Sequence, residues 1–221
     1  MNNAKNGVKI EGISKFDGGE YSRLKIDGVT NCDGDIKAES IDIDGIFNCS
    51  GTITADSIDI DGVFNCKGAI TADSIDCDGT ANFKGSIFVK ELDVDGVFKI
   101  SAGNKLEAEK IFCDGIINIC GQVSADLISA NGVISADEIV GDKICIKTHI
   151  GRFWRLFVRK SKIKLIEATT VELEGVIAAE VNGKDIIIGR NCRIENVDCS
   201  GTLRLHPRAK VKNITGNYKN L

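Results

Sequence analysis

The stretch that decides the fold is Ile41-Asp42-Ile43-Asp44-Gly45-Ile46-Phe47-Asn48-Cys49-Ser50-Gly51-Thr52-Ile53-Thr54-Ala55-Asp56-Ser57. The next seventeen residues, 58–74, repeat it with only three changes. Outward from these two units, glycines keep the same interval apart from a two-residue insertion near Gly103: Gly28, Gly45, Gly62, Gly79, Gly96, Gly115 and Gly132. A repeat this regular predicts a solenoid before local propensity is considered.

Inside the unit, apolar residues come in pairs two apart: Ile41 with Ile43, Phe47 with Cys49, and Ile53 with Ala55. A spacing of two is the periodicity of a β-strand. Each pair is followed by a corner dipeptide, Asp-Gly, Ser-Gly or Asp-Ser. These residue types tolerate sharp backbone turns, through left-handed backbone geometry or side-chain-to-backbone bonding. The unit is therefore three short strands and three corners.

Strands this short, with only one apolar side, cannot bury both faces of a flat sheet. If the units stack as rungs of a parallel β-helix, the apolar pairs fill a triangular interior and each strand bonds to the rungs above and below. The predicted inward columns are Leu24, Ile41, Ile58, Ile75, Leu92, Ile111 and Ile128 on one face, and Ile36, Ile53, Ile70, Ile87, Leu106 and Val123 on another. The fold class predicted is all-β, with rungs of about 17 residues.

The remaining face tests this prediction through side-chain size. Phe47 pairs with Cys49, whereas a later rung pairs Ala81 with Phe83, so the large and small residues have exchanged places. An enclosed, close-packed core requires such compensation.

The domain boundaries follow the repeat. We predict a disordered tail at 1–7, a β-helix over 8–150, a basic aromatic insertion at 151–162, further β-helix rungs over 163–216 and a tail at 217–221. About ten rungs are expected, and the last repeat before the insertion, 128–138, is predicted to have lost one face.

Composition narrows the function classes. The chain has 24 glycines, one proline and only 5% aromatic residues, and its net charge of −4 lacks the basic excess of a nucleic-acid-binding protein. The start has no apolar core like that of a signal peptide, so we expect a cytoplasmic protein whose nine cysteines are reduced.

The chain resembles the bactofilins, bacterial polymer-forming cytoskeletal proteins. The resemblance rests on the Ile-Asp-Gly, Gly-x-Ile and Ala-Asp-Ser-Ile motifs over residues 24–139. It also rests on the closing segments Gly189-Arg190-Asn191-Cys192-Arg193-Ile194 and His206-Pro207-Arg208-Ala209-Lys210-Val211. It implies a right-handed triangular β-helix and self-assembly into filaments without nucleotide.

The physics of a β-helix agrees with assembly, because its end rungs leave backbone N–H and C=O groups unpaired. The expected partner is the protein itself, through a polymerisation interface made of Val8, Ile10, Ile13, Phe16, Leu203, Leu205, Val211 and Ile214. Residues 1–150 carry a net charge of −11 and residues 151–221 carry +7, which favours contact between opposite ends. The resemblance implies that like ends meet, so both arrangements stay open.

The insertion is the candidate for a second contact. Its cationic and apolar residues fall on opposite sides at helical spacing, which predicts contact with an anionic membrane through Arg152, Phe153, Trp154, Arg155, Leu156, Phe157 and Arg159. The alternative is that this apolar side packs on the rod. Membrane contact would place the protein at the inner face of the cell membrane, where envelope or motility proteins are further candidate partners.

The competing class is a non-polymerising β-helix enzyme or carbohydrate-binding module. The columns of aspartates at the corners could hold divalent cations, although Asp before Gly is also an ordinary solvated corner residue. Neither histidine, His149 or His206, has a nearby acid or nucleophile in a recognisable arrangement. We therefore predict no catalytic residues, no metal site and no cofactor.

Overall fold

The structure is a computed structural model that describes residues 7–148 and 160–221. The described residues form one parallel sheet of 21 strands, wound into a solenoid of about 12 turns. The strands are β1 (Val8–Ile10), β2 (Ile13–Phe16), β3 (Gly19–Ile26), β4 (Val29–Cys32), β5 (Ile36–Ile43), β6 (Ile46–Cys49), β7 (Ile53–Ile60), β8 (Val63–Cys66), β9 (Ile70–Cys77), β10 (Thr80–Phe83), β11 (Ile87–Val94), β12 (Val97–Ile100), β13 (Leu106–Cys113), β14 (Ile116–Ile119), β15 (Gln122–Ala130), β16 (Val133–Lys147), β17 (Ser161–Glu174), β18 (Val176–Ile188), β19 (Arg193–Leu205), β20 (Lys210–Thr215) and β21 (Lys219–Asn220).

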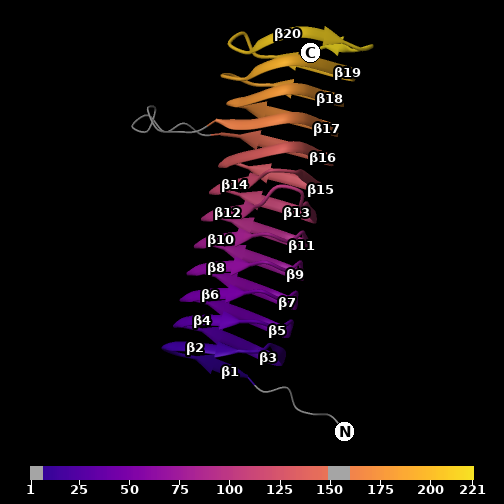
Figure 1. Ribbon diagram of the computed structural model, residues 1–221. Coiled ribbons are helices and arrows are strands. Elements are labelled where there is room, and N and C mark those ends of the chain that lie inside the picture. Colours follow the sequence, from indigo (N-terminus) through magenta and orange to yellow (C-terminus); the bar gives the residue numbers. More distant parts are fainter. Residues whose placement is uncertain (1–6, 149–159) are drawn as a thin grey trace.

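Two kinds of strand alternate in the first half of the rod. Four-residue strands such as β6 form one face, which we call the short-strand face, and eight-residue strands such as β7 bend around a corner to form the other two (Figure 1). Each strand pairs with the equivalent strand one rung away, as in Ile41↔Ile58 and Phe47↔Phe64. The predicted all-β fold with rungs of about 17 residues is confirmed.

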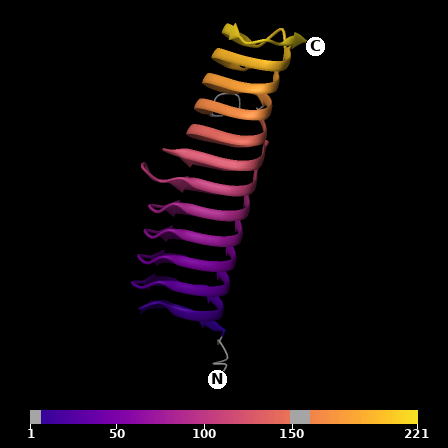
Figure 2. The same ribbon diagram turned by 90° about the vertical axis from the view of Figure 1, so that its right-hand side faces the viewer.

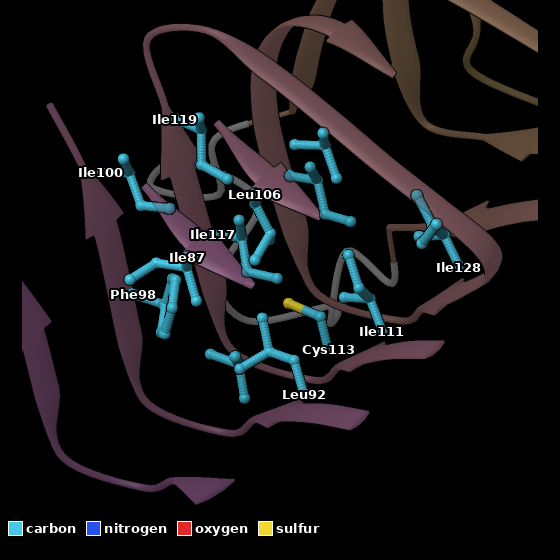
Figure 3. Close-up of a cluster of buried hydrophobic side chains, with 14 of the residues drawn as sticks. Ile87, Leu92, Phe98, Ile100, Leu106, Ile111, Cys113, Ile117, Ile119 and Ile128 are labelled. Atoms are coloured by element: carbon cyan, nitrogen blue, oxygen red, sulfur yellow. The ribbon is translucent and has the colours of Figure 1, made fainter. Parts of the chain in front are cut away.

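The core is a set of inward columns that runs the length of the rod. Leu92, Ile111 and Ile128 stack on one face, while Phe98 and Ile117 stack on the short-strand face (Figure 3). All five are essentially inaccessible to solvent. The exchange at Ala81 and Phe83 is also present, and the Phe83 ring packs 5.3 Å from Phe64 and 5.0 Å from Phe98. The large and small side chains of this rung therefore compensate for each other in size, as predicted.

The corner glycines adopt a geometry other than the left-handed one. Glycines with positive φ lie elsewhere, for example Gly12 and Gly103, and the Gly45–Gly132 corner series has none among them. A Cβ on Gly62 would lie 2.0 Å from the carbonyl oxygen of Gly45 in the rung below. The repeat needs glycine at this corner because stacked backbones approach too closely for any side chain. Of the two turn mechanisms expected at the corners, these glycines do not use left-handed geometry.

The rod is continuous from its first rung to its last (Figures 1 and 2). The prediction that a face is lost after residue 128 was wrong, because β16 covers all three faces with Ile134, Ile139 and Ile144 buried. One corner is merely a residue shorter, so that Gln122 pairs with Glu138 at a spacing of 16. The later rungs depart from the 17-residue interval, and about 12 rungs are present where about ten were expected.

The segment 217–221, expected as a tail, contains β21, which pairs with β19 through Thr202↔Lys219 and Leu203↔Asn220. The expected N-terminal tail lies outside the described residues except for Gly7.

Candidate functional site: the two ends of the rod

The N-terminal end presents an apolar surface built by the first rung. Val8, Ile10, Phe16 and Tyr21 pack against the core but remain half-buried. The Phe16 ring stacks on the Phe47 ring with 6.3 Å between their centroids. The Tyr21 ring meets Phe16 edge-on, with 6.1 Å between their centroids. Within the described part of the chain, β1 pairs only with β3 and β2 only with β4, so their outer edges keep backbone groups without a strand partner. This end combines apolar area with an open sheet edge.

The C-terminal end has the same character. Ala209, Val211, Ile214 and Tyr218 are half-buried and pack on the core. Across residues 160–221, β20 and β21 pair with β19 alone. Eight of the nine half-buried hydrophobic residues that pack on the core thus lie in the first or last rung, and the exception is Ala108.

The residues predicted for the interface fall into three groups in the structure. Val8, Ile10, Phe16, Val211 and Ile214 lie in the end rungs, and Leu205 is 38% exposed in the last full rung. Leu203 is only 1% exposed because β21 covers it. Ile13 is 88% exposed and faces away from the rod axis, in register with Val29.

Sequence reasoning missed the two tyrosines. Tyr21 stands one rung before Ala38 in the column of small corner residues, and Tyr218 lies in the segment expected as a tail. The sequence did contain a signal for them, because each tyrosine is a bulky residue at one limit of the repeat, where no further rung restricts its size.

The ends differ in charge. Residues 206–221 contain Arg208, Lys210, Lys212 and Lys219 and no acidic residue, whereas residues 7–23 contain three cations and three acids. The acidic excess of the chain therefore lies along the middle of the rod, and its C-terminal end is strongly basic.

The insertion leaves and rejoins the rod between two buried polar residues. Thr148 and Ser161 hydrogen-bond to each other at 3.0 Å, Ser161 Oγ accepts a bond from the backbone N–H of Ile134, and Thr148 donates to the carbonyl of Gly132. The strand pairing continues from β16 to β17, since Ser135 pairs with Lys162. The predicted membrane-contact residues Arg152, Phe153, Trp154, Arg155, Leu156, Phe157 and Arg159 lie outside the described residues, as does His149.

Stacked aspartates line one outer face of the rod, and their pKa values differ along one column. Burial raises the pKa of Asp76, and the carboxylates of Asp78 and Asp59 add to the shift. Burial also favours a higher pKa for Asp42, but Lys25 and Arg23 each donate to its carboxylate at 3.0 Å and lower the pKa below its ordinary value. Within the described residues, no group of three or more His, Cys, Asp or Glu side chains could hold a metal ion.

The two aspartates predict opposite mutational effects. Because the folded pKa of Asp76 is raised, its charge opposes folding at neutral pH, and this penalty vanishes as pH falls through the raised pKa. Asp76→Asn is expected to stabilise the rod at neutral pH by a few tenths of a kcal/mol, and not below about pH 3. Asp42→Asn should destabilise it at neutral pH. Urea unfolding at both pH values measures this, and equal effects of the two changes would contradict it.

The cysteines pack as small apolar groups. Cys32, Cys49 and Cys66 form an inward column, and burial raises the pKa of Cys77 and of Cys113 to about 12. All are free thiols, and Cys120 is the one that is exposed within the described residues.

We expect one thiol, Cys120, to react rapidly with a disulfide reagent in the folded protein, the half-buried Cys145 to react slowly, and all nine to react in denaturant. Counting thiols against time measures this. Rapid reaction of Cys49 or Cys66, located by peptide mapping, would show that the inward column is open.

One comparison with known proteins found a matching family. Residues 4–105 match the family model of the bactofilins, described as polymer-forming cytoskeletal. No curated protein and no solved structure matched the chain. In the parts of the chain that the structure describes, no helix has the length and apolar character needed to cross a membrane. Residues 4–105 of the chain therefore carry a bactofilin domain, and the family of that domain is described as polymer-forming cytoskeletal.

Proposed function

We propose that this protein is a structural scaffold that forms filaments by stacking its rods end to end, without nucleotide. The observation that carries the proposal is the placement of the nine half-buried hydrophobic residues that pack on the core, eight of which lie in the two end rungs. A stacked neighbour would cover this apolar area and bond the open edges of β1, β2, β20 and β21. Each joint then repeats the rung-to-rung contact inside the rod.

Charge supports the meeting of opposite ends. A joint between two C-terminal ends would bring together two surfaces that each carry four cations and no acid over residues 206–221. A joint between the C-terminal end and the balanced N-terminal rung avoids that repulsion. Opposite ends meeting also continues the parallel strand direction of the rod.

Two end-blocking variants test the proposal. Val8→Arg places a charge on the N-terminal end, and Val211→Arg places one on the C-terminal end, while Thr54→Arg on the outside of β7 serves as the control. Wild type and control are expected to form filaments in negative-stain microscopy. Each blocked variant alone should remain a single rod in analytical ultracentrifugation, and an equimolar mixture should form dimers through the two intact ends.

Each result decides a separate point. Compact single rods of wild type at all concentrations and at physiological salt would overturn the filament function. Dimers of each blocked variant alone would retain filaments but overturn the opposite-end arrangement. Circular dichroism is the control that checks whether the variants keep their β-strands.

We propose further that the filament lies in the cytoplasm against the inner face of the cell membrane, held by the basic aromatic insertion. Arg152, Trp154 and Phe157 combine positive charge with rings that suit a headgroup interface. One short segment binds lipid weakly, and a polymer multiplies it. The cellular process served is envelope synthesis, cell shape or motility, in which other proteins would join the scaffold.

The structure allows a clean deletion of the insertion. The spacing of Ser135 and Lys162 is 27 residues, and it becomes 16 without residues 149–159, as in the preceding rung. Deleting residues 149–159, so that Lys160 follows Thr148, is expected to leave filaments intact and to abolish flotation with vesicles of phosphatidylcholine and phosphatidylglycerol. Trp154→Glu with Phe157→Glu should give the same loss, and undiminished flotation of both variants would contradict membrane contact.

A further inference from the structure

The outside of the short-strand face differs from the rest of the rod. Two of every four residues on β4, β6, β8, β10, β12 and β14 point outward, and they form two columns in register. The first column, which we call the apolar ridge, is Val29, Ile46, Val63, Thr80, Val97 and Ile116. The second, the amide column, is Asn31, Asn48, Asn65, Asn82, Lys99 and Asn118.

The apolar ridge is open to solvent. Val29 is 38% exposed, and Ile46 and Ile116 are each 40% exposed. With Ile13 one rung below, this single line holds four of the seven large hydrophobic residues that are exposed in the described chain. Isolated exposed hydrophobics are ordinary on a protein surface, but an aligned row of them marks an interaction surface.

The amide column is rigid and hollowed. Asn48 donates to Asn31 at 3.0 Å, Asn65 to Asn48 at 2.9 Å and Asn82 to Asn65 at 3.0 Å. These bonds link the side chains from rung to rung along the column. A groove of about 600 Å³ follows the column and is bounded on its far side by Ser50, Lys67 and Lys84. The face thus has a ridge on one half and a groove on the other.

The two edges of this face carry opposite charges. Asp44, Asp61, Asp78 and Asp95 precede the ridge, and Lys67 and Lys84 follow the groove. Asp61, Asp78, Lys67 and Lys84 are exposed and form no ion pair with another described residue. Across this face the order is therefore the acidic edge, the apolar ridge, the groove and the basic edge.

This order is complementary to itself in one arrangement only. If a second rod faces the first about a twofold axis parallel to the rods, each ridge meets a groove and each acidic edge meets a basic edge. If the twofold axis runs across the rods, ridge meets ridge and Asp61 and Asp78 face their own copies, which repel.

We propose that two parallel rods pair side by side through their short-strand faces, with the ridge of each seated in the groove of the other. The occupant of the groove is a second copy of this chain. Seven four-residue strands, β2 to β14, give a footprint on the order of 450 Å² per copy, which is below the size of a standard specific interface. One pair of rods therefore binds weakly, and end-to-end stacking multiplies the contact along a filament. The pairing rests on the proposed filament function.

The acidic edge argues against an anionic membrane as the occupant. Lipid headgroups would attract Lys67 and Lys84 but repel Asp44, Asp61, Asp78 and Asp95 along the other edge of the same narrow strip.

Filament width tests the pairing, because electron microscopy distinguishes one rod from two. Wild-type filaments are expected to be two rods wide. Ile46→Glu with Val63→Glu should give filaments one rod wide, with the concentration needed for pairing raised roughly tenfold or more. Thr54→Glu with Thr71→Glu is the matched control, since these residues stack on the outside of another face in the same rungs.

A charge exchange tests the arrangement. Lys67→Asp with Lys84→Asp should separate the pairs, and adding Asp61→Lys with Asp78→Lys should restore them, because each edge again meets its opposite. An arrangement with the twofold axis across the rods predicts no such loss and rescue.

Wild-type filaments one rod wide would overturn the pairing while leaving the filament function intact. The absence of any wild-type filament would overturn the filament function itself, and the pairing with it. Vesicles of phosphatidylcholine and phosphatidylglycerol form the last arm. If they bind wild type but not the Ile46→Glu, Val63→Glu variant, and filaments stay single without them, the face belongs to lipid and the pairing is wrong.

Discussion

Replacing Gly62 by alanine is expected to lower the free energy of unfolding by at least about 3 kcal/mol. The added Cβ would lie 2.0 Å from the carbonyl oxygen of Gly45 and 2.6 Å from that of Asp44. Those oxygens belong to a backbone fixed by ladder bonds, such as the 2.8 Å bond from the Val63 N–H to Gly45. The rungs must separate to admit the methyl group, and the separation breaks these bonds. Urea unfolding followed by circular dichroism measures the loss.

Gly103 provides the control for this substitution. Its φ is +83°, and a Cβ there would meet nothing within 4 Å. Gly103→Ala should therefore cost only the strain of a left-handed residue, about 1 kcal/mol. If Gly62→Ala proves no worse than Gly103→Ala, close approach between rungs is not the reason for the glycine ladder.

The second large effect concerns the exchanged side chains of one rung. Phe83→Cys alone leaves a void between Phe64 and Phe98 and should cost about 3 kcal/mol. Ala81→Phe alone adds a ring to a filled interior and should cost about 1–3 kcal/mol. The double variant gives this rung the Phe and Cys pattern of its predecessor, Phe64 with Cys66. It should lie within about 1 kcal/mol of wild type.

A double-mutant cycle over these four proteins gives the coupling energy. Rescue in the double variant shows that the rung is constrained by total volume, as a closed interior requires. Additive costs would mean that the two sites do not share one packed space. Phe88→Ala serves as the outside control, because Phe88 lies on the outer surface of β11, half-buried beside Lys105.

Much of the fold could be predicted from the sequence because the apolar residues and glycines recur at fixed intervals. The spacing of two within strands and of 17 between rungs identified inward columns such as Ile41, Ile58 and Ile75, and register pairing confirms them. The later rungs were harder to recognise. β17 and β18 pair at a spacing of 15, as in Lys162↔Ile177, and 43 residues separate the corner glycines Gly132 and Gly175, so the 17-residue period is hidden although the rung is complete.

The candidate site was predicted only in part. Apolar residues at the limits of the repeat pointed to the ends, and Val8, Ile10 and Val211 lie there. The cover of Leu203 by β21 was not predicted, because Lys219 and Asn220 lie at the 17-residue spacing but lack the apolar residues that mark a rung. Ile13 was grouped with the inward residues, but it lies outside because it is in register with Val29, at a spacing of 16 rather than 17.

The sequence by itself determined that the chain coils into a three-sided rod, because the direction of each side chain follows from its place in a strand and a rung. The tertiary structure alone decided why glycine occupies the corners, since this depends on the distance between backbones one rung apart. It also decided which outward residues become neighbours. The ridge, groove and charged edges of the short-strand face exist only once residues 17 positions apart lie side by side.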